Sequence, residues 1–213
     1  MIKIGLTGSI GMGKSETAKI FSGLGVPVYD ADASVHKLYE AGNKGALAIK
    51  NLYPEAISKD GSVDRKVLGG IVVGNKNKIK KLEEIIHPLL QEDRAIFFEK
   101  NINEKVVILD IPLLYETNGE KHVDYVIVVS TSEKIQRERV LKRPDMTDDK
   151  FNKILISQIP NTIKCQKADF IIDTSISIDD AEKQALNILE EIEQNERNRT
   201  WYRNHWLEPW QWR

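Results

Sequence analysis

The chain has little of what several classes of protein require. Its 213 residues include one cysteine, Cys165, which excludes an internal disulfide and a cysteine-rich metal site. The formal net charge is −1, so the chain has no general attraction for nucleic acid or an anionic membrane. No apolar run approaches membrane-spanning length, and the first apolar segment is too short for a signal peptide. These absences predict a cytoplasmic globular protein without nucleic-acid or membrane partners, and they leave its oligomeric state open.

What the chain does have is a phosphate-binding loop near its start. Residues 8–15 read GSIGMGKS and match the pattern G-x-x-x-x-G-K-[ST] at every fixed position. Glycines let successive N–H groups point at one anion, and a helix N-terminus adds partial positive charge. The pattern predicts nucleoside triphosphate binding, with Lys14 on the outer phosphates and the Ser15 hydroxyl on Mg²⁺. The alternative is a glycine-rich strand-to-helix turn with a chance lysine.

Short apolar runs alternate with helical patterns along the chain. The runs are residues 2–6, 26–30, 106–110, 125–129 and 170–172. This alternation predicts an α/β fold with a parallel sheet covered on both faces. The GTPase motifs D-x-x-G and N-K-x-D are not matched, because residues 110–113 read DIPL and residues 75–78 read NKNK. A small phosphotransferase therefore fits better than a GTPase switch.

Acidic residues end two of the predicted strands. Asp30 ends the second strand, with Asp32 two residues later, and Asp110 ends the third. The carboxyl ends of parallel strands form the edge at which α/β proteins bind ligands. Asp32 is a candidate general base or metal-shell carboxylate, and the alternative is that it caps the following helix. Asp110 has the position of the acid that holds Mg²⁺ in P-loop proteins.

The region from residue 40 to residue 100 is polar and helical in pattern, with no strong strand. This pattern predicts a helical insertion outside the sheet. Lysines cluster at residues 76–81, either as a solvated helix face or as a contact for an acidic substrate. His87 precedes Pro88, and the residue before a proline is biased away from helical conformation, so a break or kink is expected. The alternative to ligand binding by His87 is a partly buried side chain that orients this joint.

Two arginines lie at the end of the helix predicted over residues 133–142. Arg139 and Arg143 are four residues apart and share a face, which suits a polyphosphate. The alternative is an exposed charged face. A short amphipathic segment, residues 150–158, follows and ends at Pro160. A segment of this kind, flanked by arginines, predicts a lid that closes over ATP and excludes water.

The C-terminal tail holds every tryptophan of the chain. These are Trp201, Trp206, Trp210 and Trp212, and arginines lie beside them. Aromatic rings interleaved with arginine are typical of base stacking or of a membrane interface. The alternative is a tail that folds back on its own domain or pairs with another subunit, and the near-neutral charge favours it.

From residue 1 to about residue 192, the chain resembles the dephospho-CoA kinases in the order and spacing of its motifs. The resemblance rests on GLTGSIGMGKS at 5–15, DAD at 30–32, HP at 87–88, DIPLL at 110–114, and Gln136 with the two arginines. It implies a P-loop, nucleoside-kinase-like three-layer fold with a five-stranded parallel sheet, a helical CoA-binding region and a small lid. The implied bounds are 1–30, 101–140 and 165–195 for the core, 31–100 for the acceptor region, 141–164 for the lid and 196–213 for the tail.

The same resemblance implies transfer of the ATP γ-phosphoryl group to the ribose 3′-hydroxyl of dephospho-CoA, the last step of coenzyme A synthesis. The implied catalytic residues are Asp32 as base, Lys14, Arg139 and Arg143. The implied ATP site is Gly8, Ser9, Ile10, Gly11, Met12, Gly13, Lys14, Ser15 and Thr17. The implied acceptor site is Asp32, His87, Leu113 and Arg139, and the implied Mg²⁺ ligands are Ser15 and Asp110.

Two other functions are weighed against this one. A nucleoside monophosphate kinase usually places several arginines in the acceptor region, whereas residues 40–100 contain only Arg65 and Arg94. A non-enzymatic, ATP-dependent module acting through the aromatic tail would release no ADP in response to an acceptor. The dependence of ADP release on the acceptor therefore separates the three.

Overall fold

The computed structural model describes the backbone of residues 1–206 and the side chains of residues 1–198. The side chains of the four tryptophans lie outside the described residues, so the alternatives for the aromatic tail stay predictions. The first residues of this tail continue the last helix, α9 (Ile178–Trp206). Among the described helices, none combines the length and apolarity that a membrane span requires.

The centre of the fold is a five-stranded sheet in which every pairing is parallel. The strands are β1 (Ile2–Thr7), β2 (Val28–Asp30), β3 (Val106–Asp110), β4 (Tyr125–Ser130) and β5 (Phe170–Asp173). Their order is β2-β3-β1-β4-β5, so the strand that leads into the phosphate-binding loop is central. Apolar runs become parallel strands here because both faces of the sheet are covered. The predicted α/β fold is confirmed.

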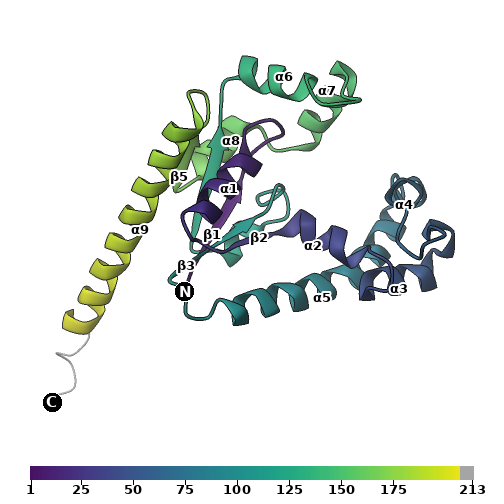
Figure 1. The fold of residues 1–213 in the computed structure, drawn as a ribbon, viewed down its shortest axis with the longest axis horizontal. Helices are drawn as coiled ribbons and strands as arrows, with labels where there is room; N and C mark the ends of the chain where they lie inside the picture. The colour runs from purple at the N-terminus through teal and green to yellow at the C-terminus, as the bar shows by residue number, and fades with distance from the viewer. Residues whose placement is uncertain (207–213) are drawn as a thin grey trace.

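Alternating side chains of β4 show the two covered faces. Ile127 and Val129 belong to a core cluster with α9 and with Phe21 of α1 (Lys14–Gly23). Val126 and Val128 belong to a second cluster, against which the region of α8 (Asn161–Lys167) packs. Successive strand residues point to opposite faces, so one apolar run serves both layers. Figure 1 shows the resulting arrangement of sheet and helices.

A helical lobe projects from the sheet on the side away from α9 (Figure 1). It contains α2 (Ala31–Leu38), α3 (Lys44–Leu52), α4 (Arg65–Val72) and α5 (Lys76–Lys100), with a 3₁₀ turn at Pro54–Ala56. The lobe has its own buried cluster, which includes Ile49, Tyr53, Leu68 and Ile86. It therefore buries apolar side chains of its own, outside the sheet.

Of the break or kink expected at His87–Pro88, the break is wrong, because α5 runs through both residues as one helix. Pro88 has no backbone N–H and so removes one hydrogen bond of the helix, but the neighbouring turns of α5 keep their backbone hydrogen bonds. The helix is also held on both sides of the proline. Ile86 is buried in the lobe, and the Phe97 ring lies 5.4 Å from the ring of Tyr29, centroid to centroid. The side chain of His87 is exposed, so it does not orient a buried joint.

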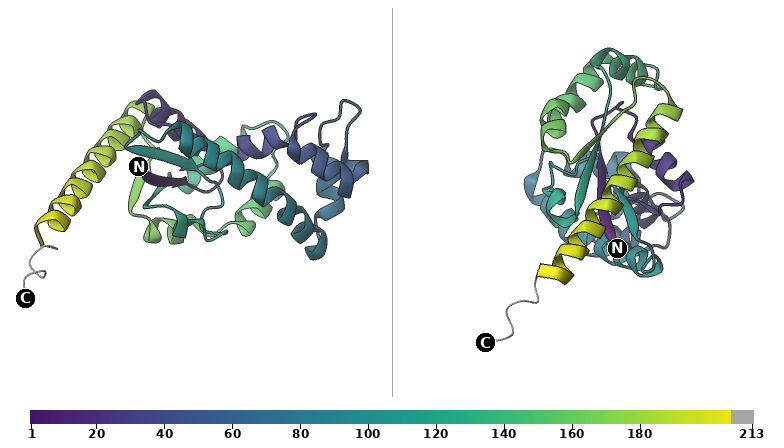
Figure 2. Two further views of the ribbon diagram at one scale, coloured as in Figure 1. Left: turned by 90° about the horizontal axis from the view of Figure 1, so that it is seen from below. Right: turned by 90° about the vertical axis from the view of Figure 1, so that its left-hand side faces the viewer.

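The segment between β4 and β5 forms three helices. These are α6 (Glu133–Leu141), α7 (Asp148–Ser157) and α8. The Ser132 and Thr147 side chains accept hydrogen bonds at the N-termini of α6 and α7, which explains why each helix begins there. Figure 2 shows these helices beside the sheet and the far end of α9 extending away from it.

Candidate active site

The phosphate-binding loop connects β1 to α1, and its glycines are required by close packing. Gly11 and Gly13 have positive φ angles of 79° and 99°. A Cβ atom on Gly11 would lie 2.5 Å from Cγ2 of Val140, and one on Gly13 would lie 2.9 Å from Oγ1 of Thr174. Residues with side chains rarely adopt such angles, and no room exists for them here. Both glycines therefore bring the loop backbone against α6 and the end of β5.

This loop lines a cavity of about 660 Å³. Every residue predicted to bind ATP lines it, as do Asp32, Arg139 and Arg143. Further lining residues come from elsewhere in the chain and include Pro112, Ile154, Gln158, Thr174 and Ile178. His87 and Leu113, predicted to bind the acceptor, do not line this cavity, and both are exposed. The structure therefore brings together most of the predicted site.

Acidic side chains gather where β2 and β3 end. The two strands are in register so that Asp30 lies opposite Asp110. Burial raises the pKa of Asp110, the neighbouring Lys14 opposes this rise, and the charges of Asp30 and Asp32 add to it. Because the charges of both aspartates reach Asp110, the three carboxylates form one electrostatic group at the carboxyl edge of the sheet.

Asp30, and not Asp32, caps α2. The Asp30 carboxylate accepts a hydrogen bond of 2.9 Å from the backbone N–H of Ala33. The alternative in which Asp32 is the cap is therefore wrong. The N-cap needs extended backbone, which Asp30 has as the last residue of β2, whereas Asp32 lies in the first turn of the helix. The Asp32 side chain is exposed at the cavity.

Lys14 and Asp110 form an ion pair at the base of the loop. The Lys14 side chain is 16% exposed and that of Asp110 is 4% exposed, so the pair is largely shielded from solvent. A buried carboxylate without a partner would be costly, and the ammonium offsets that cost. The pair also holds the lysine at the carboxyl edge of the sheet.

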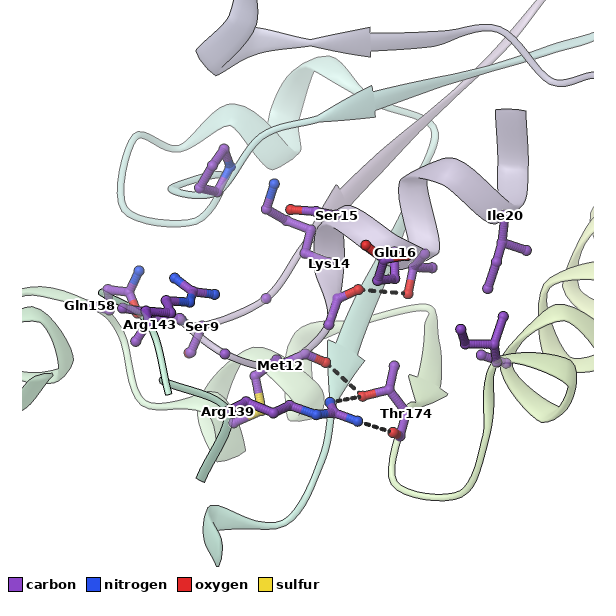
Figure 3. A pocket seen from close by; sticks show the side chains of 18 of the residues that line it. Ser9, Met12, Lys14, Ser15, Glu16, Ile20, Arg139, Arg143, Gln158 and Thr174 are labelled. Atoms are coloured by element: carbon purple, nitrogen blue, oxygen red, sulfur yellow. Dashed lines mark hydrogen bonds between the residues drawn. The ribbon is translucent and has the colours of Figure 1, made fainter. Parts of the chain in front are cut away.

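Arg139 and Arg143 both line the cavity but are held differently. Arg139 donates hydrogen bonds to Thr174, 2.9 Å to the hydroxyl oxygen and 2.7 Å to the carbonyl oxygen. The Thr174 hydroxyl donates in turn to the carbonyl oxygen of Met12, at 2.8 Å (Figure 3). Arg143 lies beyond the end of α6 and is exposed, so the two arginines reach the same cavity without both belonging to the helix.

Sequence reasoning assigned no role to three polar residues of this site. Gln136 donates to the carbonyl oxygen of Ile10 at 2.7 Å, and Gln158 accepts from the Ile10 N–H at 3.0 Å. Thr174 is the third. Gln136 belongs to the motifs of the resemblance, and Thr174 directly follows the strand predicted last, so both carried a positional signal. Gln158 carried only the signal that it ends the amphipathic segment predicted to form the lid.

The predicted Mg²⁺ ligands can be tested by their chemistry. Ser15 supplies a hydroxyl at the cavity, and Asp110, which does not line the cavity itself, supplies a carboxylate that is paired with the lining residue Lys14. Oxygen donors suit Mg²⁺, which usually takes one or two protein ligands and completes its shell with phosphate oxygens and water. Within the described residues, no three acidic, histidine or cysteine side chains cluster closely enough to bind a metal by themselves. The donor set therefore fits Mg²⁺ bound together with a phosphate.

Comparison with known proteins assigns the family. The family model described as dephospho-CoA kinase matches residues 2–180. A dephospho-CoA kinase of Bradyrhizobium diazoefficiens is 51% identical over 191 residues, which cover 89% of this chain and 94% of that protein. A dephospho-CoA kinase of Rhodopseudomonas palustris is 47% identical over 192 residues, which cover 89% of this chain and 95% of that protein.

Solved structures agree with this result. A crystal structure of a Thermus thermophilus protein has a TM-score of 0.78 at 28% identity and covers 89% of this chain and 96% of its own. A dephospho-CoA kinase from Campylobacter jejuni has a TM-score of 0.61 at 28% identity, with the same coverage. Together with the phosphate-binding loop and the carboxylates beside it, these matches show that the chain belongs to the dephospho-CoA kinase family.

Proposed function

We propose that this protein transfers the γ-phosphoryl group of ATP to the ribose 3′-hydroxyl of dephospho-CoA, giving coenzyme A and ADP. The observation that carries the proposal is the position of Asp32. Its carboxylate lies at the cavity of the phosphate-binding loop and is not used as a helix cap, because Asp30 fills that position. A carboxylate placed beside a phosphate cradle is what a hydroxyl acceptor needs in order to lose its proton.

The remaining groups of the cavity fit the other requirements of phosphoryl transfer. The loop amides and Lys14 hold the β and γ phosphates of the co-substrate ATP. Arg139 and Arg143 neutralise charge on the phosphates, and Thr174 keeps the first of these arginines beside the loop. Phosphoryl transfer depends mainly on positioning and on charge neutralisation, because the protein does little covalent chemistry.

Ser15 and Asp110 are the proposed Mg²⁺ ligands. The bound cation would neutralise the phosphate oxygens. Asp110 needs its charged form for this role, and the ammonium of Lys14 favours that form against the effect of burial. When the phosphates occupy the loop, Lys14 can exchange its carboxylate partner for a phosphate oxygen, which leaves Asp110 for the cation.

The acceptor is proposed to lie between the sheet edge and the helical lobe. The proposed acceptor region is residues 31–100, and the proposed lid is residues 141–164. His87 on α5 and Leu113, which is 42% exposed beyond β3, lie outside the nucleotide cavity and remain candidates for acceptor contacts. A cytoplasmic location is proposed as well, because the proposed reaction uses soluble metabolites.

The experiment is an assay of ADP release with Mg²⁺ and ATP across three conditions: dephospho-CoA, nucleoside monophosphates, and no acceptor. We expect ADP release only with dephospho-CoA, and formation of coenzyme A in equal amount. Release only with a monophosphate would assign a nucleotide kinase instead. Tight ATP binding without acceptor-dependent release would assign a regulatory module.

A further inference from the structure

Two side chains of the segment that contains α6, α7 and α8 form hydrogen bonds with one residue of the phosphate-binding loop, Ile10. The carbonyl oxygen of Ile10 accepts from Gln136 on α6, and its N–H donates to Gln158, which directly follows α7. Gln158 also lines the nucleotide cavity (Figure 3). Both hydrogen bonds use backbone groups of Ile10, so they depend on the conformation of the loop itself. A displacement of the Gln158 side chain would therefore remove a hydrogen bond from the backbone of the loop.

The backbone next to Gln158 is held at Ile159. The backbone N–H of Ile159 donates a hydrogen bond of 2.8 Å to Oε1 of Glu116. The same oxygen lies 2.8 Å from the ammonium of Lys164 on α8. The Lys164 side chain is 0% exposed, and that of Glu116 is 14% exposed. One carboxylate oxygen thus holds both the chain next to Gln158 and a buried lysine.

A buried ammonium makes this anchor hard to displace. Removing a charge from water is costly unless a partner charge is present, so Glu116 cannot leave without exposing Lys164 to that cost. The pKa of Glu116 agrees: burial raises it, but the neighbouring Lys164 ammonium and the hydrogen bond from the Ile159 N–H outweigh burial and lower it. The carboxylate is therefore held charged and in place.

The anchor is itself fixed to the sheet. Glu116 directly follows Leu114 and Tyr115, which are buried in the cluster on the α8 side of the sheet. The carbonyl oxygen of Pro112 accepts a hydrogen bond of 3.0 Å from the hydroxyl of Thr7 at the end of β1. The chain from β3 to Glu116 is thus attached to the strand that leads into the phosphate-binding loop. Neither Glu116 nor Lys164 lines the nucleotide cavity.

We propose that Glu116 and Lys164 are positioning residues that keep Gln158 bonded to Ile10 and thereby hold the phosphate-binding loop in its ATP-binding conformation. The ion pair acts on ATP through the Ile159 backbone and the Gln158 side chain, without touching the nucleotide. The inference rests on the proposed function only in taking ATP as the ligand of the loop. It makes the ion pair a determinant of ATP affinity as well as of stability.

The test is a double-mutant cycle on ATP affinity, with Lys164→Met and Gln158→Leu as the two changes. The probe is a non-hydrolysable ATP analogue with Mg²⁺, titrated by calorimetry into the full chain. We expect each single variant to weaken binding about tenfold, the order expected for one lost hydrogen bond, and the double variant to be no weaker than either single one. Additive losses would show that the two residues act independently and would refute the proposal.

A rescue variant separates positioning from folding. Glu116→Gln combined with Lys164→Met removes both charges but keeps an oxygen acceptor for the Ile159 N–H. We expect its ATP affinity to return to within about threefold of the unaltered protein. Glu116→Asp keeps the charge but shortens the side chain, so we expect it to weaken ATP binding like Lys164→Met. If Lys164→Met does not fold, Glu116→Asp replaces it in the cycle.

The matched control is Ile192→Val, a buried change on α9 in the core cluster on the opposite face of the sheet from the residues next to Glu116, which costs stability without touching the loop. We expect its melting temperature to fall and its affinity for the ATP analogue to stay unchanged. Affinity unchanged in both Lys164→Met and Glu116→Asp would overturn the inference. The proposed function is tested separately, because binding of the analogue needs no acceptor: a protein that binds it but does not phosphorylate dephospho-CoA would overturn only the function.

Discussion

Replacement of Asp32 by asparagine is the sharpest test of the reaction. The change keeps the size of the side chain and removes its charge and its ability to accept a proton. Asp32 is exposed and Asp30 provides the helix cap, so the change should leave the fold intact. We therefore expect an unchanged melting temperature together with a large loss of turnover.

The size of the loss follows from the role. General-base catalysis contributes about 10²- to 10⁴-fold, so turnover with dephospho-CoA should fall by that factor, equivalent to about 2.7–5.4 kcal/mol in the activation free energy. ATP affinity should change little, because the loop amides, Lys14 and the arginines are untouched. Any small change in ATP affinity should be an increase, because a negative charge near the phosphates is removed. The assay is steady-state ADP release combined with calorimetric binding of a non-hydrolysable ATP analogue.

The matched control is Asp30→Asn, which removes a neighbouring carboxylate of the same electrostatic group. Asparagine is as good an N-cap as aspartate, so α2 keeps its cap. Both variants lose one negative charge near Asp110, but only Asp32→Asn loses the proposed base. Turnover near normal in Asp32→Asn, or an equal loss in both variants, would refute the assignment of Asp32 as the base.

The remaining predictions concern the loop, its supports and pH. Lys14→Met should weaken binding of the ATP analogue and lower turnover, as measured by titration and by ADP release; a normal turnover would contradict phosphate contact by Lys14. Gly13→Ala should abolish ATP binding and lower the melting temperature, because its Cβ would lie 2.9 Å from Thr174 Oγ1 at a φ of 99°. Thr174→Val should raise the KM for ATP about tenfold, because Arg139 and Met12 lose a hydroxyl partner, while Thr174→Ser should stay close to the unaltered protein. The pKa of Glu116 is lowered below its ordinary value of 4.5, so it contributes stability that is present above pH 4.5 and lost as pH falls through the lower folded-state pKa. The acid unfolding of Glu116→Gln should therefore lack part of the pH dependence that the unaltered protein shows between pH 4.5 and the lower folded-state pKa of Glu116. The same acid-unfolding curve in both proteins would contradict a contribution of the ion pair.

Local sequence determined the parts of this protein that depend on local physics. The phosphate-binding loop follows from glycines at fixed spacing after an apolar run, because only such residues let the backbone turn around an anion. The parallel sheet follows from five apolar runs that can each be buried on both faces. Asp32 and Asp110 followed as candidates because acids at the ends of neighbouring parallel strands meet at one edge.

Tertiary structure decided what depends on contacts between distant segments. Whether Asp30 or Asp32 caps α2 depended on where β2 ends, since the cap needs extended backbone. The passage of α5 through Pro88 depended on packing on both sides of the proline, which outweighs a local preference against helix. The attachment of Gln158 to Ile10, and of Lys164 to Glu116, joins residues 148 and 48 positions apart. Such pairs leave no periodic trace in the chain, because what selects them is a shared buried space that exists only once the sheet has formed.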